Sequence, residues 1–492
     1  MSAEPFPILT LGDPRLEQTC ADVTEWDEEL ARQLERLHAT LDDVRRRRGF
    51  GRAIAAPQVG LLRRVIAMNL GAGPVSLINP EILWRSEERF EVWDDCLSVP
   101  DCIVRVCRHL SISLRYHDEL GRPRTWLRLP PDLAELIQHE VDHLDGILMT
   151  RRAVGPDAVR PIAEHAQLVA ASRPTHRLSL DRIAAAARTI DPVFLHSPQY
   201  ECEPLSDTLG CRFTLKLETT NPIRSFKGRG ADFFLSEVEA RGERRPLICG
   251  SAGNWGQALA YAARRRGRTL VVYAPRNASP LKLERMRRFG AYVRLFGDDF
   301  DAAKAEAKRV AAESGAWMVE DGLEPEISEG AGSIAVELLA GNPAFDAILV
   351  PLGNGAMLNG IARWVKAASP ATLVIGVCAE GADSMQRSFA AGAPLAADKV
   401  DTIADGIAIR EPVSEAVADM KGVVDEVHLV SDGHIIEAMR LLYSHSGLLI
   451  EPAGAAGLAA LLSTTEWRGA RVATVLCGSN ITDEQIRKWI LS

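Results

Sequence analysis

Four short apolar runs in the C-terminal part of the chain constrain its fold more than any other feature. They cover residues 269–273, 347–350, 373–377 and 472–476. Amphipathic segments with helical periodicity lie between them, for example residues 257–266 and 281–289. Strands that are buried on both faces have such unbroken runs, whereas half-exposed strands alternate apolar with polar residues. The pattern therefore predicts an α/β fold with a buried, mostly parallel sheet.

Residues 1–150 show a different pattern, in which short strand-like runs lie between two helix-like segments. The helix-like segments cover residues 26–47 and 131–143, and the second follows the start signal Pro130-Pro131-Asp132. The strand-like runs cover residues 64–68, 103–106 and 110–116. This order predicts an α+β domain. Residues 151–176 are rich in Arg, Ala, Pro and His, and we expect them to be a linker with a short helix before a second domain at 177–492.

The composition is that of a globular protein. The 492 residues include 57 basic and 66 acidic side chains, and this net charge of −9 argues against general binding of nucleic acid or acidic membranes. The nine cysteines have no framework spacing, and the N-terminus has neither a basic region nor an apolar stretch. No run reaches the roughly 18 apolar residues of a membrane span. We therefore expect a cytoplasmic protein that binds neither nucleic acid nor membranes.

The first chemical motif is the segment HEVDH, in which His139 and His143 are four residues apart. Residues four apart share one face of a helix, so both imidazoles can bind one metal ion. Cys96 offers a third, thiolate ligand, and this set leaves one coordination position open for water, as catalytic sites require. A metal there would acidify the water, and Glu140 would act as general base and then as acid. The alternative is an exposed helix with two unrelated histidines.

Two further groups can stabilise an oxyanion at such a metal, namely the side chain of Gln58 and the backbone N–H of Leu97. These segments, in this order and with the opening ILTLGDPRL, resemble the peptide deformylase family over about residues 8–150. The resemblance implies a deformylase-like α+β fold and three ligands to a divalent metal: Cys96, His139 and His143. The metal is commonly ferrous iron in that family, and thiolate and imidazole also suit zinc.

The sequence departs from the deformylase pattern at two places close to the expected metal. Ala53 replaces a glycine of the first motif, and Asp94-Asp95 replace the usual Glu-Gly before Cys96. The Asp95 carboxylate would narrow the pocket and add negative charge. We therefore expect a small N-formylated substrate rather than the end of a nascent protein.

The second domain contains four segments that can carry chemistry. Lys227 lies between Phe226 and a glycine, where a desolvated amine can form a Schiff base. Segment 251–257 (SAGNWGQ) opens a helix whose amides can bind a carboxylate, and the small residues of 353–357 (GNGAM) let amides surround a phosphate. Cys477 ends the last apolar run and can meet a ring nitrogen. Taken singly, these segments also fit a surface lysine, two tight turns and a buried thiol.

Together these segments resemble the pyridoxal-phosphate enzymes of the threonine/serine dehydratase group, which have the tryptophan synthase β-like fold (fold type II). The resemblance covers about residues 178–492 and implies two open parallel-sheet subdomains, the smaller inserted at about 230–345. It implies that Lys227 is the Schiff-base lysine and proton shuttle and that Phe226 packs on the cofactor ring. The other implied cofactor contacts are Asn254, Gly353, Asn354, Gly355, Ala356, Met357 and Cys477. The implied substrate contacts are Ser251, Ala252, Gly253 and Gln257.

The two resemblances are connected by the chemistry of the substrate nitrogen. A formyl group draws the nitrogen lone pair into an amide, so a formylated amino acid cannot react at a pyridoxal cofactor until the formyl group is removed. We therefore predict a bifunctional enzyme of small-molecule or natural-product metabolism that deformylates an amino acid and then performs β-elimination, of the dehydratase or ammonia-lyase type, or β-replacement. The alternative is a threonine/serine dehydratase or a threonine synthase-like enzyme with a non-catalytic deformylase-like module. Relatives are commonly dimers, so a homodimer is expected.

Overall fold

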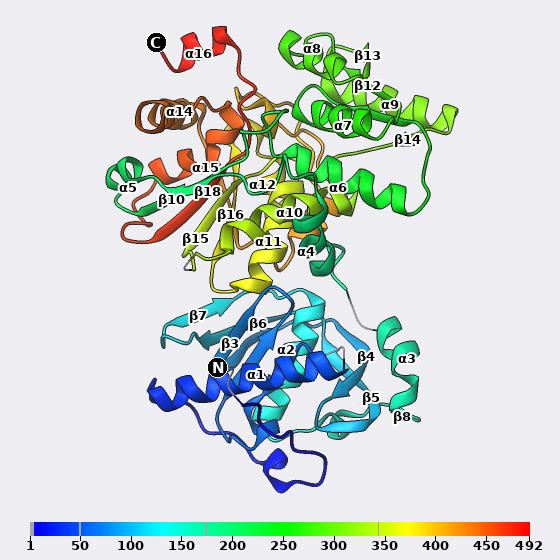
Figure 1. Cartoon of the computed structure of the whole chain (residues 1–492), viewed down its shortest axis with the longest axis vertical. Helices are drawn as coiled ribbons and strands as arrows, with labels where there is room; N and C mark the ends of the chain where they lie inside the picture. The colour runs from blue at the N-terminus through cyan, green and yellow to red at the C-terminus, as the bar shows by residue number, and fades with distance from the viewer. Residues whose placement is uncertain (1–3, 49–50, 173–174, 343) are drawn as a thin grey trace. The chain divides into compact units, whose positions relative to one another are not determined.

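The structure is a computed structural model that describes residues 4–48, 51–172, 175–342 and 344–492 (Figure 1). The chain divides into two compact units. The first comprises Met1–His176 and Lys366–Ala371, and the second comprises Arg177–Val365 and Thr372–Ser492.

The α-helices of the described residues 4–172 are α1 (Glu28–Arg48), α2 (Pro131–Leu144) and α3 (His165–Ser172). The strands of the first unit are β1 (Ala53–Ala55), β2 (Val65–Asn69), β3 (Pro74–Arg85), β4 (Arg89–Cys96), β5 (Val99–His109), β6 (Ile112–His117), β7 (Pro123–Trp126) and β8 (Val159–Pro161). They form a five-stranded antiparallel sheet in the order β1-β2-β3-β6-β7 and a three-stranded antiparallel sheet in the order β4-β5-β8.

Helices α1 and α2 pack on opposite faces of the five-stranded sheet. Successive side chains of a strand point to opposite faces, and β2 shows this alternation directly. Val65 and Ala67 belong to the core cluster that contains the apolar residues of α1, whereas Ile66 and Met68 belong to the cluster that contains those of α2. Every residue of α2 from Leu133 to Leu144 is buried. Helix α2 is therefore an interior helix, and it holds its polar side chains away from bulk water.

We expected residues 151–176 to be a linker. The described residues of this segment, 151–172 and 175–176, lie within the first unit, and residues 173–174 are outside the described residues. Strand β8 pairs antiparallel with β5, with Ile103 opposite Arg160 and Val104 opposite Val159. The backbone N–H of Trp93 in β4 also donates to the hydroxyl of Ser172 in α3 at 3.0 Å. These contacts attach the segment to the three-stranded sheet.

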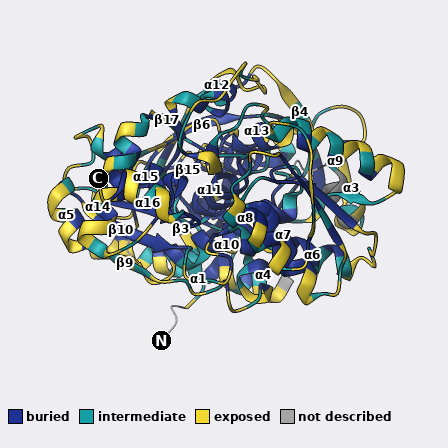
Figure 2. Ribbon diagram, turned by 90° about the horizontal axis from the view of Figure 1, so that it is seen from above, coloured by how far each residue is buried: buried dark blue, intermediate teal, exposed yellow. Residues whose placement is uncertain are grey.

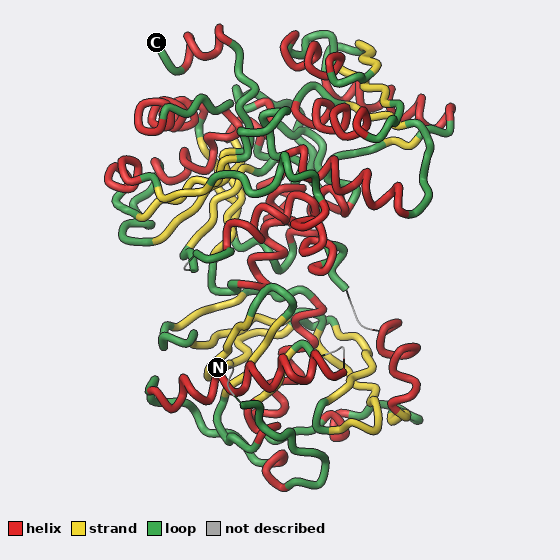
Figure 3. Tube along the Cα trace, viewed as in Figure 1, coloured by secondary structure: helices red, strands yellow, loops and turns green. Residues whose placement is uncertain are grey.

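The second unit alternates helices and strands (Figure 3). Its strands are β9 (Gln199–Glu201), β10 (Arg212–Leu217), β11 (Leu247–Gly250), β12 (Leu270–Ala274), β13 (Tyr292–Leu295), β14 (Trp317–Met318), β15 (Ala347–Pro351), β16 (Leu373–Ala379), β17 (Glu426–Val430) and β18 (Arg471–Leu476). Its helices are α4 (Leu180–Thr189), α5 (Glu203–Leu209), α6 (Lys227–Ala240), α7 (Asn254–Arg265), α8 (Pro280–Arg288), α9 (Phe300–Ser314), α10 (Pro325–Leu339), α11 (Ala356–Ala368), α12 (Ser384–Ala391), α13 (Ser414–Met420), α14 (Asp432–Ser446), α15 (Pro452–Leu462) and α16 (Asp483–Trp489).

The larger sheet of the second unit has the order β17-β16-β15-β18-β10-β9 and is parallel except for the pairing of β9 with β10. Strand β15 is buried at every position (Figure 2). One face of the sheet packs against α14 and α15, whose apolar residues share a core cluster with Leu215, Leu349 and Ile375. Burial on both faces explains the unbroken apolar runs of these strands.

The smaller sheet has the order β13-β12-β11-β14, with all pairings parallel. Leu247 and Cys249 of β11 pack with the apolar residues of α7, whereas Ile248 packs with Ala303 and Ala307 of α9. The two helices therefore cover opposite faces of this sheet. The expected α/β fold with two parallel sheets is confirmed, as is the α+β fold of the first unit. No helix in the described ranges is long and apolar enough to span a bilayer.

Candidate active sites

The first site is a cluster of three buried side chains that could hold a metal ion, Cys96, His139 and His143, whose possible ligand atoms all lie within 4.8 Å of one another. The two histidines are one turn apart on the interior helix α2, and their ring centroids are 4.9 Å apart. Cys96 ends β4 at an irregularity in the pairing with β5, and its Sγ lies 3.2 Å from Nε2 of His143. The structure thus brings together the three residues that the sequence predicts as metal ligands.

A buried acid–base network holds this cluster in place. Nδ1 of His139 donates to Oδ2 of Asp94 at 3.0 Å, and Nη2 of Arg108 donates to the same oxygen at 2.8 Å. Arg108 also contacts the carboxylate of Asp142 at 2.5 Å. Burial by itself would raise the pKa of Asp94, but His139 and Arg108 hold that pKa well below its usual range. Asp94 therefore stays ionised and fixes the ring of His139.

Gln58 and Glu140 lie at the same cluster. Oε1 of Gln58 accepts the backbone N–H of Ala55 at 2.8 Å, which leaves the Gln58 amide N–H₂ to point at Ser98 Oγ (3.3 Å) and Cys96 Sγ (3.6 Å). Glu140 is 3% exposed, and burial raises the pKa of its carboxyl to about 7. Its Oε2 has no hydrogen-bond partner among the described residues. An amide donor and a buried carboxyl group beside three ligands are suited to hydrolysis of an amide.

Three other positions near the cluster are also placed by the structure. Leu97 is buried in the turn that follows Cys96 and belongs to the α1 core cluster. Ala53 begins β1 and is buried opposite Met68. The Asp95 carboxylate lies 3.5 Å from Nε2 of His165 in α3, so it interacts with the segment that covers the three-stranded sheet.

The second site is a cavity of about 390 Å³ in the second unit. Its lining includes these predicted site residues: Phe226, Lys227, Ser251, Ala252, Gly253, Asn254, Asn354 and Cys477. The lining residues come from the N-terminus of α6, the loop between β11 and α7, the loop after β15, and the end of β18. These segments are far apart in the sequence, and they meet because parallel strands present their carboxyl ends to one side.

Lys227 is the first residue of α6, and its Nζ lies 2.5 Å from Oδ2 of Asp321 and 4.5 Å from the ring centre of Phe226. The backbone N–H of Phe226 donates to the carbonyl of Cys477 at 3.0 Å. This bond joins the segment of Lys227 to the end of β18. Cys477 is buried, and burial raises the pKa of its thiol far above the usual range, so the thiol stays protonated.

A hydrogen-bonded set of polar side chains orients Asn254 at the cavity. Its Nδ2 donates to Oε1 of the buried Glu451 at 2.6 Å, and its Oδ1 accepts from Nδ2 of Asn480 at 2.7 Å. The hydroxyl of Ser251 accepts the backbone N–H groups of Gly253 (3.2 Å) and Gly256 (2.9 Å), which shapes the turn into α7. Gln257 is fully buried behind Asn254, 3.5 Å from its Oδ1, and does not line the cavity.

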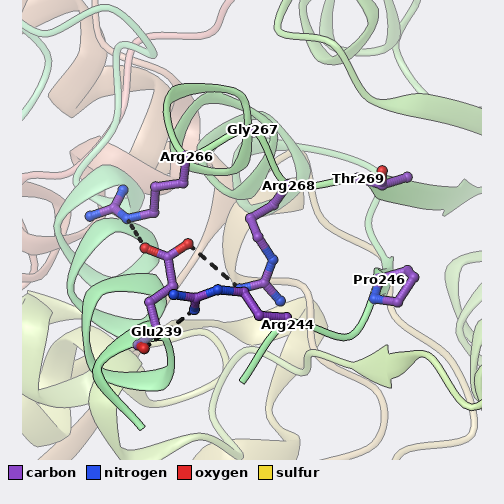
Figure 4. A pocket seen from close by; sticks show the side chains of 7 residues that line it. All are labelled: Glu239, Arg244, Pro246, Arg266, Gly267, Arg268 and Thr269. Carbon is purple, nitrogen blue, oxygen red and sulfur yellow. Dashed lines mark hydrogen bonds and ion pairs between the residues drawn. The ribbon is translucent and has the colours of Figure 1, made fainter. Parts of the chain in front are cut away.

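Another cavity of the second unit, of about 450 Å³, is lined by three arginines and is shown in Figure 4. It lies where α6 and α7 end and β11 and β12 begin, so it is at the end of these strands opposite to Lys227. Glu239 pairs with Arg266 (3.4 Å) and Arg268 (3.7 Å), and Arg244 donates to the backbone carbonyls of Glu239 and Glu243. Arg244 thus binds a carbonyl at the carboxyl end of α6, where a cation is stabilising. The cavity contains no group suited to covalent chemistry.

Comparison with known proteins decides the family. Residues 190–478 match the model of the pyridoxal-phosphate dependent enzyme family, which is more than half of the chain. The chain belongs to this family. Residues 5–158 match the polypeptide deformylase family, so the chain joins a deformylase-like domain to a pyridoxal-phosphate enzyme domain. Both sequence-based resemblances are confirmed.

Individual relatives of the pyridoxal-phosphate domain are threonine dehydratases. The chain is 32% identical over 313 residues to the L-threonine ammonia-lyase of Thermotoga maritima, which covers 64% of this chain and 78% of that protein. It is 32% identical over 294 residues to the L-threonine dehydratase biosynthetic IlvA of Pasteurella multocida, covering 59% of this chain but only 57% of that enzyme. The processed form of threonine deaminase isoform 2 from Solanum lycopersicum superposes with a TM-score of 0.60 at 28% identity, over 63% of this chain and 90% of that one.

The residues around Lys227 fit pyridoxal phosphate. The turn 353–357 approaches its neighbours so closely that a Cβ at Gly353 would lie 2.9 Å from the carbonyl oxygen of Gly406. Gly355 has a φ of +92°, a conformation that residues with side chains rarely adopt. Helix α11 begins at Ala356, so its free backbone amides suit a phosphate. Of the five residues predicted to hold the phosphate, Asn354 contributes to the cavity lining, and Gly353, Gly355, Ala356 and Met357 do not.

The donor atoms of the first site also fit a divalent metal. One thiolate and two imidazoles are the donors of iron and zinc sites with an open position. Asp94 engages Nδ1 of His139, so Nε2 is the nitrogen left for a metal. Two residues that contact predicted site residues were not singled out from the sequence for these contacts: Asp94 beside His139 and Asp321 beside Lys227. Both residues reach their partners only in the folded chain. For Asp94 the sequence gave one indication, because it lies two residues before the predicted ligand Cys96.

Proposed function

We propose that the second unit catalyses the pyridoxal-phosphate-dependent β-elimination of an amino acid, and that the first unit is a metal-dependent hydrolase that frees the amine of that amino acid from a formyl group. The observation that carries the first part is the position of Lys227, whose Nζ reaches a cavity of about 390 Å³ lined by the predicted cofactor and substrate residues. The family membership and the threonine dehydratase relatives support the same reaction class.

In the second unit, Lys227 would hold the cofactor and then move the proton at the substrate Cα. Pyridoxal phosphate, when bound, supplies an electron sink for that carbon. The turn from Ser251 to Asn254 would bind the substrate carboxylate, because it leads into the N-terminus of α7, where the helix dipole favours an anion. The protonated thiol of Cys477 offers the cofactor ring a neutral neighbour, which suits elimination.

In the first unit, the three ligands at the end of β4 and on α2 would hold iron or zinc. The metal, when bound, supplies a Lewis acid. Glu140 would move the proton from the attacking water to the leaving amine, and its buried carboxyl with a pKa of about 7 suits both directions of transfer. Gln58 and the backbone N–H of Leu97 would donate hydrogen bonds to the oxygen of the formyl group.

The order of the two reactions follows from the substrate nitrogen. An amide nitrogen cannot displace Lys227 from the cofactor, whereas the free amine can. The deformylase-like unit would therefore act first, on a small formylated amino acid. The alternative reaction for the second unit is β-replacement, in which a second nucleophile takes the place of the leaving group. The alternative for the first unit is a binding module without hydrolysis, which Asp95 favours because it adds a carboxylate next to the ligand Cys96.

The experiment compares free and N-formyl amino acids with the full chain loaded with both cofactor and metal. We expect formate and ammonia from the formylated compounds, and ammonia alone from the free ones. Glu140→Gln should abolish formate release and leave ammonia release from free amino acids intact. Glu164→Gln, at a partly exposed carboxylate outside both sites, is the matched control. If Glu140→Gln released as much formate as the parent, the proposed hydrolase mechanism would be contradicted. If no amino acid released ammonia, the proposed lyase would be contradicted.

A further inference from the structure

A buried carboxylate beside Lys227 has no role in the reaction described above. The side chain of Asp321 is 6% exposed, and its Oδ2 is 2.5 Å from Nζ of Lys227. Asn354 also donates to Oδ2, at 3.3 Å. The other oxygen, Oδ1, is buried and has no hydrogen-bond partner among the described residues. Asp321 lines the same cavity as Lys227, so half of its carboxylate is left for a ligand.

Asp321 differs from Glu320, another carboxylate of the cavity lining, in its cationic partners. The described lining has the carboxylates Asp299, Glu320, Asp321, Asp405 and Glu451, and the ammonium groups Lys227, Lys282 and Lys304. Lys282 pairs with Asp405 at 2.6 Å, and Glu320 binds Lys304 and Lys308. Glu320 therefore has two cationic partners of its own, whereas the cationic partner shown for Asp321 is Lys227.

During the proposed reaction, Asp321 loses the ammonium group of Lys227 as its partner. Lys227 must give its nitrogen to the cofactor, and once the substrate amine displaces it, the lysine must be an uncharged amine to accept the Cα proton. At that point Asp321 is a buried carboxylate without its ammonium partner, which is a costly state in a protein interior. A substrate that brings an ammonium group of its own to this place would restore the pair.

We propose that Asp321 is a specificity-determining residue that selects an amino acid with a second amino group on Cβ, a 2,3-diamino acid. This inference rests on the proposed β-elimination and names its substrate class. Asp321 binds the β-ammonium group and keeps it protonated, so that it departs as ammonia. A hydroxyl leaving group, as in serine or threonine, offers Asp321 no charge.

The reaction balances without an oxidant or a reductant. The Cα–H bond and the Cβ–N bond break, a carbon–carbon double bond forms, and the β-nitrogen leaves as ammonia with the proton it already carries. Lys227 takes the Cα proton. The three-carbon product then exchanges its remaining amine for the oxygen of one water, so one 2,3-diaminopropionate and one water give one pyruvate and two molecules of ammonia. L-Serine gives pyruvate and one ammonia by the same steps.

The test measures both binding and turnover of L-2,3-diaminopropionate and L-serine by the cofactor-loaded full chain. Binding is read from the change in the visible spectrum of the bound cofactor on titration, and turnover from pyruvate release. We expect the parent protein to bind the diamino acid about tenfold or more tightly than L-serine, because only the diamino acid forms a buried charge pair with Asp321. Asp321→Asn should remove this preference by weakening diamino-acid binding while L-serine binding changes little. Asp321→Glu, which keeps the charge, should retain a preference.

The outcomes separate this inference from the proposed function. Asp298→Asn is the charge-matched control, because Asp298 is 95% exposed on the surface of the same unit. A parent protein that is loaded with cofactor and converts L-serine, yet binds both amino acids equally, would overturn the role of Asp321 alone. An Asp321→Asn variant that keeps the parent preference would do the same. A protein that neither shows cofactor absorbance nor releases pyruvate from any amino acid would overturn the proposed function and this inference together.

Discussion

Nδ1 of His139 donates a hydrogen bond to Oδ2 of Asp94 at 3.0 Å, inside the interior of the first unit. Arg108 binds the same oxygen, and it also binds Asp142 one turn along α2 from His139. The carboxylate therefore fixes both the orientation of the ring and the nitrogen that faces Cys96 and His143. A carboxylate in this position also makes the imidazole a better metal donor.

Replacing Asp94 tests this support. Asp94→Asn keeps the size and the hydrogen-bond acceptor but removes the charge, and we expect the affinity for iron or zinc to fall by about 10- to 100-fold. Metal content is measured after equilibration with a series of chelator concentrations. Asp101→Asn, at an exposed position of β5, is the control and should bind metal like the parent. Equal chelator resistance in Asp94→Asn and the parent would show that Asp94 has no such role.

Replacing Lys227 tests cofactor binding without reference to turnover. The parent protein should show visible absorbance after loading with pyridoxal phosphate, and Lys227→Ala should lose it because no amine remains to bond the cofactor aldehyde. Lys421→Ala, at an exposed position after α13, should load like the parent. Absorption spectra after dialysis give the comparison, and a Lys227→Ala protein with the parent spectrum would refute the assignment.

A third prediction concerns the stability of the second unit. Arg229 is fully buried and pairs with Glu218 (2.8 Å) and Glu337 (2.7 Å). Arg229→Met leaves two buried carboxylates with less compensation, and we expect a loss of about 3–5 kcal/mol in the free energy of unfolding. Arg309→Met is the matched control, since Arg309 also pairs with two glutamates but is 54% exposed.

Thermal unfolding followed by circular dichroism measures both arginine variants. The Arg309→Met midpoint should stay close to that of the parent, because surface ion pairs contribute little to stability. The Arg229→Met midpoint should fall clearly. Equal midpoints for the two variants would mean that burial of the Arg229 network has no energetic consequence.

The same network predicts a pH dependence. Burial alone would raise the pKa of Glu337, but Arg229 and Lys216 outweigh burial and lower it to about 2. The pKa of a glutamate in an unfolded chain is about 4.3, so ionised Glu337 stabilises the fold above that pH, and this contribution is lost as the pH falls towards 2. Glu337→Gln should therefore be less stable than the parent at pH 7, and the gap should narrow between about pH 4.3 and pH 2.

Unfolding midpoints at a series of pH values test this prediction. Glu313→Gln, at a 64% exposed position of α9, is the control, and its difference from the parent should stay small throughout. A gap between Glu337→Gln and the parent that is constant from pH 7 to pH 2 would contradict the assignment of the low pKa.

The elements that the sequence predicts correctly are those whose burial pattern is local. The run at residues 347–350 is strand β15 (Ala347–Pro351), and the segment at 131–143 is helix α2 (Pro131–Leu144). Strands β3 and β4 were not predicted. Strand β3 contains Pro80 and β4 contains several charged residues, so neither shows a clear strand pattern. Antiparallel pairing stabilises both: β3 pairs with β6, which lies further along the chain, and β4 pairs with the next strand, β5.

For the two sites as well, residues in local motifs were predicted, whereas contacts between distant segments were not. Motif spacing predicted the three residues that meet at the Cys96–His139–His143 cluster and eight of the residues that line the Lys227 cavity. Gln257 was predicted to contact substrate, but the first turn of α7 places it behind Asn254. Asp321 could not be predicted, because it meets Lys227 across 94 positions of sequence through the order of strands in the smaller sheet. Long-range pairs of this kind depend on topology, which a single sequence does not display.

The place of β18 in the larger sheet has a consequence for how the protein is made. This strand lies between β15 and β10, with Arg471 opposite Arg212, so the centre of the sheet is closed by a strand that is synthesised after the other five strands of that sheet. Until then β10 and β15 each expose an edge whose backbone hydrogen-bonding groups are unpaired. A nonsense codon shortly before residue 471 would therefore remove a central strand rather than trim a tail, and the released polypeptide would be prone to aggregate.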